Sequence, residues 1–78
     1  MNVDRLVAMV NDIAAFFMGE AGAEAPAAVA NHLQRFWEPR MRSQIIAAYR
    51  NDPSSLRNLS ETGRAAIVEL AASEPSPP

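Results

Sequence analysis

The 78-residue chain contains no cysteine and no lysine, and it has a single histidine. Without cysteine it forms no disulfide and offers no thiolate to a metal or an iron–sulfur cluster. This absence is compatible with a reducing cytoplasm, which is where we expect the protein. A domain of this size buries only roughly 60% of the surface that its unfolded chain exposes, and its core rarely contributes more than about 3–5 kcal/mol. We therefore expect a partner protein to supply additional stability.

Residues suited to catalysis or metal binding are also scarce. His32 has no carboxylate, cysteine or second histidine three or four positions away, so the local pattern of an acid–base pair is missing. We interpret His32 as a border residue that packs on Phe36. Gly19 and Gly22 have the spacing of a turn and not of a phosphate-binding loop, and the acidic residues lack the spacing of a metal loop. We predict no catalytic, cofactor-binding or metal site in this chain, and no enzymatic activity of its own.

Long uninterrupted hydrophobic runs are absent as well. The longest apolar stretch, residues 6–18, contains Asn11 and Asp12 and is shorter than the roughly 20 residues that span a bilayer. Asp4 and Asp12 are also atypical of a signal peptide. We expect neither a membrane span nor a membrane partner.

Charge is unevenly distributed along the chain. The net charge of −2 gives no general attraction to nucleic acid, but residues 1–34 carry −3, residues 35–50 carry +3 and residues 51–78 carry −2. All seven basic residues are arginine, which favours the planar, bidentate contacts found at interfaces, although a GC-rich genome also favours arginine over lysine. Positive charge is therefore concentrated in the middle of the sequence.

The apolar residues recur with helical periodicity and show no strand-like alternation. They predict an all-α fold, a small bundle of three main helices and a shorter fourth. The predicted helices cover residues 3–18, 26–37, 39–50 and 60–72. Residues 1–72 would form a single helical domain, and residues 73–78, rich in proline and serine, a disordered tail.

The first predicted helix has an apolar arc of about 180°, against the roughly 100° that a surface helix needs. The surplus lies on the side of Met9 and Phe16. It is either a partner surface or the sign of a helix placed centrally in the bundle.

Pro39 predicts a sharp corner between the second and third helices, because the residue before a proline is disfavoured in the helical conformation. The ring of Trp37 is then either exposed together with Arg40 at this corner or packed in the core at helical spacing. Arg42 falls on the apolar side of its helix, where a guanidinium is costly unless a carboxylate or backbone carbonyls pair with it. Glu38 would serve as that carboxylate, and so would an acceptor on a partner.

Tryptophan and arginine are enriched at interface hot spots, which favours protein binding as the function of this region. The residues predicted to bind a partner are Trp37, Pro39, Arg40, Arg42, Phe16 and Met9. Phe36 and Met41, in contrast, are assigned to the core.

Three segments, LVAMVNDIAAFF (residues 6–17), VANHLQRFWEPRMRSQI (29–45) and LSETGRAAIVELA (59–71), follow one another along the chain. In order and spacing they resemble the small delta subunit of cytoplasmic, molybdenum-containing, NAD-dependent formate dehydrogenases. The aromatic pair, the proline and the Arg-Met-Arg run of the middle segment are the most specific features. The last segment is looser, since family members often read LSPLVRAAV where this chain has Glu61, Thr62 and Gly63.

The resemblance implies a non-catalytic subunit that binds the catalytic alpha subunit and supports its assembly, cofactor loading or stability. In such complexes the alpha subunit holds the molybdenum bis-guanine dinucleotide cofactor and iron–sulfur clusters, and oxidises formate to carbon dioxide. The beta and gamma subunits hold FMN and further clusters and pass electrons to NAD.

Two other classes of function remain open. The helices at residues 26–37 and 39–50 have the order of a helix-turn-helix, so a free-standing DNA-binding or regulatory protein is the main alternative. The proline corner and the acidic net charge argue against nucleic acid as the partner. An enzyme with a site dispersed over several helices is the third possibility, and the wide apolar face permits a homodimer of the isolated chain.

Overall fold

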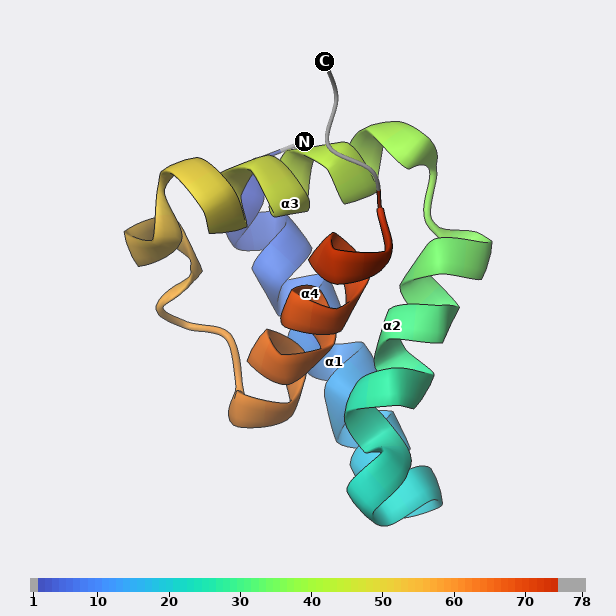
Figure 1. The fold of residues 1–78 in the computed structure, drawn as a ribbon. Coiled ribbons are helices and arrows are strands. Elements are labelled where there is room, and N and C mark those ends of the chain that lie inside the picture. Colours follow the sequence, from blue (N-terminus) through green and yellow to red (C-terminus); the bar gives the residue numbers. More distant parts are fainter. Residues whose placement is uncertain (1, 75–78) are drawn as a thin grey trace.

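The computed structural model describes residues 2–74, and in this range the fold is all-α (Figure 1). The helices are α1 (Val3–Ala21), η1 (Gly22–Glu24), α2 (Ala25–Phe36), α3 (Pro39–Asn51), η2 (Pro53–Leu56) and α4 (Glu61–Ser73), where η marks a short 3-10 helix. The predicted helical bundle is confirmed. The predicted start of the tail at residue 73 is too early, because Ser73 belongs to α4 and Glu74 is its C-cap residue. Residues 75–78 lie outside the described residues.

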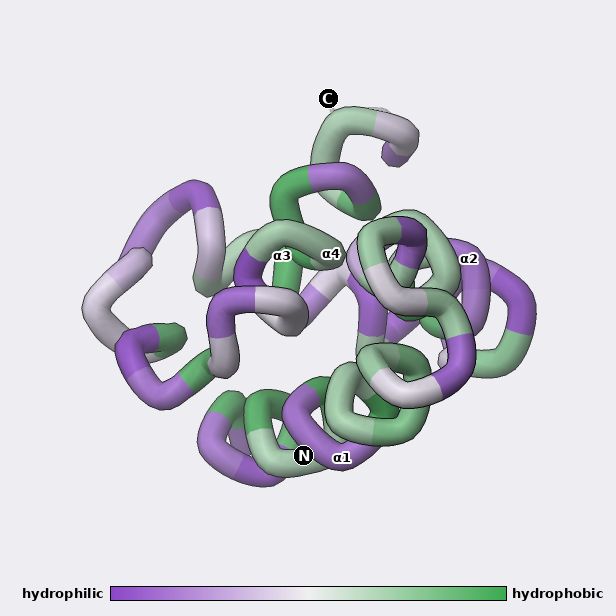
Figure 2. The backbone as a smooth tube through the Cα atoms, turned by 90° about the horizontal axis from the view of Figure 1, so that it is seen from below, coloured by the Kyte–Doolittle hydropathy of each residue, from purple (hydrophilic) through white to green (hydrophobic). Residues whose placement is uncertain are grey.

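The arrangement is built on a hairpin. α1 and α2 run antiparallel, lie close together at the turn between them and diverge toward their other ends, while α4 packs into the opening and α3 crosses its far end (Figure 1). Hydrophobic residues recur along the whole of α1, whereas the connection from α3 to α4 is mostly hydrophilic (Figure 2). The core lies between the hairpin, α3 and α4. Its largest fully buried side chains are Leu6, Leu33, Ile45, Leu56, Ile67 and Leu70, with Val10 and Val29.

Local signals explain where α1 begins and ends. The side chain of Asn2 accepts a hydrogen bond from the backbone N–H of Arg5 at 2.8 Å, which satisfies one of the free donors at the helix start. The predicted end of this helix at residue 18 is too early, because α1 continues to Ala21. It ends at Gly22, whose φ of 55° is a conformation that glycine adopts without a steric cost.

The corner between α2 and α3 follows from Pro39. α2 ends at Phe36, Trp37 and Glu38 are extended with ψ of 144° and 147°, and α3 begins at Pro39 itself. The predicted corner is therefore confirmed. Of the two alternatives for Trp37, the structure has the one in the core and not the exposed one, since only 7% of this residue is accessible and it belongs to the core cluster.

Arg42 ties this corner to the end of α4. Its Nε donates to Oε1 of Glu74 at 3.0 Å, and its Nη1 donates to the backbone carbonyl oxygens of Gln34, at 3.1 Å, and Trp37. The expected need for a carboxylate and carbonyls is thus met within the chain. The carboxylate is that of Glu74, and not that of Glu38 as expected, because the helix that ends at Glu74 reaches the corner.

The start of α4 is fixed against α1. Ser60 caps the helix by accepting from the backbone N–H of Gly63 at 3.0 Å, and the side chain of Asn11 donates to the carbonyl oxygen of Asn58 and accepts from the N–H of Ser60. A Cβ atom at position 63 would lie 3.1 Å from Cγ1 of Val10, which is closer than ordinary van der Waals contact. Glycine at this position therefore permits the close approach of the two helices.

We expect Gly63→Leu to lower the free energy of unfolding by about 1–3 kcal/mol, because the added side chain overpacks the contact between α4 and α1. The same substitution at Gly19 meets open space in a helix and should raise stability by about 0.5–1 kcal/mol through helix propensity. Urea unfolding followed by circular dichroism measures both. Equal stabilisation by the two variants would contradict the close packing at Gly63.

We expect Arg42→Met to lower the free energy of unfolding by about 1–3 kcal/mol, since it leaves a carboxylate and two carbonyl groups without their donor. Arg40→Met is the matched control in the same helix. Arg40 is exposed, makes no hydrogen bond within the described residues and lies in the first turn, where the helix dipole disfavours a cation. Its replacement should leave stability within about 0.5 kcal/mol of the wild type or raise it slightly. A neutral Arg42→Met would show that these contacts add nothing to stability.

Candidate functional site

The largest apolar side chains exposed in residues 2–74 gather on the α1–α2 hairpin. Phe36 is 71% exposed and Phe16 is 62% exposed, and Met18 is also more than half exposed. Val68, on α4, is a further exposed apolar residue, outside the hairpin. A chain with so small a core thus leaves several of its large hydrophobic residues in contact with water.

Four rings form a continuous row across the hairpin, which we call the aromatic row: Phe16, Phe17, His32 and Phe36. The ring centroids of Phe16 and Phe17 are 5.1 Å apart, those of Phe17 and His32 5.9 Å, and those of His32 and Phe36 4.9 Å. The first two contacts are edge-to-face and the third is tilted, which are favourable arrangements for aromatic pairs. The row joins the C-terminal part of α1 to the C-terminal half of α2, and each ring holds its neighbour in place.

The first half of the chain has more apolar surface than its core uses. By length and composition alone, Val3–Phe36 meets the criterion for a membrane span, with a mean hydropathy of 1.3 in an 18-residue window, yet only 22% of that window is buried. In the structure this stretch is not one helix, because the chain reverses at Gly22 between α1 and α2. A mostly buried core helix of a soluble protein and a signal sequence near the N-terminus pass the same test, so this finding alone is weak evidence for a membrane span. The low burial agrees with the exposed rings of the aromatic row.

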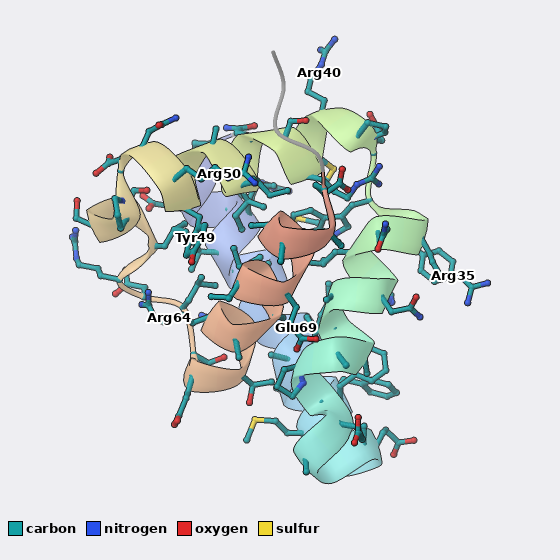
Figure 3. All side chains as sticks on the ribbon, viewed as in Figure 1. Arg35, Arg40, Tyr49, Arg50, Arg64 and Glu69 are labelled. Atoms are coloured by element: carbon teal, nitrogen blue, oxygen red, sulfur yellow. The ribbon has the colours of Figure 1, made fainter. Side chains whose placement is uncertain are left out.

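Cationic side chains lie at the corner between α2 and α3, where α2 ends at Phe36. We call Arg35, Pro39 and Arg40 the corner surface; all three are exposed. Figure 3 shows Arg35 extending outward from α2 and Arg40 extending away from the start of α3. Neither arginine makes a hydrogen bond or an ion pair with any residue in the described part of the chain. Their guanidinium groups are therefore available to an external acceptor.

The residues predicted to bind a partner fall into two groups. Phe16, Pro39 and Arg40 are exposed, and Met9 is half-buried and packs against the core. Trp37 is buried in the core, and Arg42 is engaged with Glu74 and two carbonyl groups. The predicted arginine-and-tryptophan surface is thus not formed, because the tryptophan lies beneath the corner. Whether the exposed residues bind a partner stays a prediction.

Phe36 is the main residue that sequence reasoning placed incorrectly. It was assigned to the core because Val29, seven residues earlier, lies on the same helical stripe, and Val29 is fully buried. The two helices diverge toward the corner (Figure 1), so the same stripe that meets α1 near Val29 faces solvent at Phe36. The spacing of His32 and Phe36, four residues apart beside the wide arc of α1, was the available signal.

This surface is made of aromatic rings and guanidinium groups. Among residues 2–74, no group of three or more His, Asp or Glu side chains lies close enough together to hold a metal ion. His32 contacts two phenylalanine rings on its two sides, as expected for packing against Phe36. Rigid aromatic rings beside unpaired guanidinium groups are the kind of side chains that carry binding energy at protein interfaces.

Comparisons with known proteins identify the family. Searches of the curated proteins and of the solved structures gave no match. One family model does match, that of the NADH-dependent formate dehydrogenase delta subunit FdsD, and it covers residues 5–73. This range includes the aromatic row and the corner surface, and it confirms the resemblance seen in the sequence. The chain therefore belongs to the FdsD family of formate dehydrogenase delta subunits.

Proposed function

We propose that this chain is a non-catalytic subunit that binds the catalytic alpha subunit of the formate dehydrogenase and supports its assembly, cofactor loading or stability. Membership of the family makes the chain a formate dehydrogenase subunit; the alpha subunit as partner and the supporting role are our proposal. The observation that carries it is the aromatic row, whose end rings, Phe16 and Phe36, are both mostly exposed.

The energetics of the row favour a protein partner. Burying an exposed phenylalanine contributes roughly 1.5–3 kcal/mol of favourable free energy. This is a large amount beside the stability that the core of so small a domain supplies. Each ring of the row already contacts a neighbouring ring, which reduces the conformational freedom that is lost when a partner covers it. The exposed rings of the row therefore contribute more to the stability of a complex than to that of the isolated chain.

The cofactors of the complex are assigned by this proposal to its other subunits. Molybdenum bis-guanine dinucleotide and iron–sulfur clusters would belong to the alpha subunit, and FMN, further clusters and the NAD site to the beta and gamma subunits, all in the cytoplasm. This chain has no cysteine, and its one histidine packs between two phenylalanine rings. Its residues therefore do not fit the role of cluster or metal ligands.

The test is co-expression of tagged alpha subunit with the wild-type chain and with the double variant Phe16→Ala/Phe36→Ala. We expect the double variant to lose about 2–4 kcal/mol of binding free energy, because two apolar anchors are removed. The recovered chain, the molybdenum content of the alpha subunit and its formate oxidation should fall together. Both residues are exposed, so circular dichroism should show an unchanged fold.

Val68→Ala is the matched control, since it removes an exposed apolar side chain from α4, outside the hairpin. It should co-purify like the wild type. Co-purification of the double variant at the wild-type level would contradict the proposal, and so would a wild-type chain that binds membranes and leaves the alpha subunit unbound.

A further inference from the structure

We infer that the corner end of the hairpin inserts Phe36 into an apolar pocket of the alpha subunit whose rim carries carboxylates, and that Arg35 and Arg40 pair with those carboxylates. This inference rests on the proposed function and adds to it the chemistry of the partner's surface. The observations that point to it are one exposed ring, in contact with its neighbour His32, and two unpaired guanidinium groups at the same corner of the fold.

Phe36 has the properties of an interface anchor. It is the most exposed of the large apolar side chains in the described part of the chain, at 71%. Its ring nevertheless has a fixed neighbour, since the His32 ring lies 4.9 Å away and itself packs against Phe17. A protruding ring that is already ordered binds a pocket at a lower entropic cost than a mobile side chain.

The arginines of the chain divide into those used inside the fold and those left free. Arg42, Arg50, Arg57 and Arg64 all donate to carbonyl or carboxylate oxygens of this chain. Arg5, Arg35 and Arg40 have no side-chain hydrogen bond or ion pair within residues 2–74. Arg35 immediately precedes Phe36 at the end of α2 and Arg40 lies in the first turn of α3, so two of the three are at the same corner of the fold.

The position of Arg40 strengthens the argument for an acidic partner. It lies in the first turn of α3, which contains no acidic residue, so its charge meets the positive end of the helix dipole. Glu38 precedes this turn but makes no ion pair with either arginine. An external carboxylate beside Arg40 would pair with its guanidinium group and with the helix dipole, and a second carboxylate would pair with Arg35.

A second copy of this chain is the principal rival occupant. The turn end of the hairpin carries Glu20 and Glu24, which are exposed and have no ion pair among the described residues. Two copies packed end to end would bring these carboxylates to Arg35 and Arg40. The membership of the chain in a family of enzyme subunits favours the alpha subunit as occupant, and the experiment below separates the two.

The experiment measures the dissociation constant of full-length chain and purified alpha subunit between about 50 and 400 mM salt. For Arg35→Gln/Arg40→Gln we expect binding at the lowest salt to weaken roughly fivefold to thirtyfold, with a flatter salt dependence, because two rim ion pairs are lost. Arg5→Gln, which removes an equally unpaired charge from the start of α1, should leave the dissociation constant and its salt dependence unchanged. Arg35→Lys/Arg40→Lys keeps the charge and should retain most of the salt dependence.

Phe36→Ala separates the apolar part of the contact from the ionic part. It should weaken binding at every salt concentration without changing the salt dependence, as expected for a buried anchor. Wild-type affinity and salt dependence in Arg35→Gln/Arg40→Gln would overturn the inference and leave the proposed function intact. No binding by the wild-type chain would instead overturn the proposed function.

Sedimentation equilibrium of the isolated chain tests the rival. A monomeric wild-type chain supports the inference. Two results together would overturn it in favour of self-association. The first is a dimer that both Arg35→Gln/Arg40→Gln and Glu20→Gln/Glu24→Gln convert to monomer. The second is an affinity for the alpha subunit that these substitutions leave unchanged.

Discussion

The constraint on which the rest of the structure depends is the restriction that Pro39 places on the residue before it. Because Glu38 is held in the extended region, α2 stops at Phe36 and α3 starts three residues later, at Pro39, in a new direction. The corner turns Trp37 into the core, brings Arg42 within reach of the carbonyl groups at the end of α2, and leaves Arg40 outside. One proline thus determines which of the neighbouring residues pack inside the fold and which are exposed to solvent.

The fold was predictable because its signals are local. Helical periodicity, the caps at Asn2 and Ser60, the turn at Gly22 and the restriction before Pro39 each act within a few residues of themselves. The partner of Arg42 was not predictable in the same way, since the carboxylate that it binds lies 32 positions along the chain. The sequence indicated that this arginine needed acceptors, and only the packing of α4 determined which ones.

The binding surface was less predictable, because exposure depends on where helices diverge. A helical wheel treats a stripe as equally covered along its length, and this assumption fails for α2, where Val29 is buried and Phe36 is exposed. The wide arc of α1 did indicate surplus apolar surface, and Phe16 is exposed as that arc suggested. What the sequence lacked was the angle between the two helices, which follows from the insertion of α4 between them.

The use of arginine connects stability to binding in this chain. With no disulfide available, arginines of α3 hold the end of α4: Arg42 bonds Glu74, and Arg50 donates to the carbonyl oxygen of Ala71 at 2.9 Å. Cations suit this position, because the last carbonyl groups of a helix carry its negative end. Arg35 and Arg40 have the same chemistry but no such acceptor within residues 2–74. Arginine therefore stabilises the bundle at the positions where a helix end lies beside it. At the corner, the guanidinium groups of Arg35 and Arg40 have no acceptor in the described residues and can bind a carboxylate of another molecule.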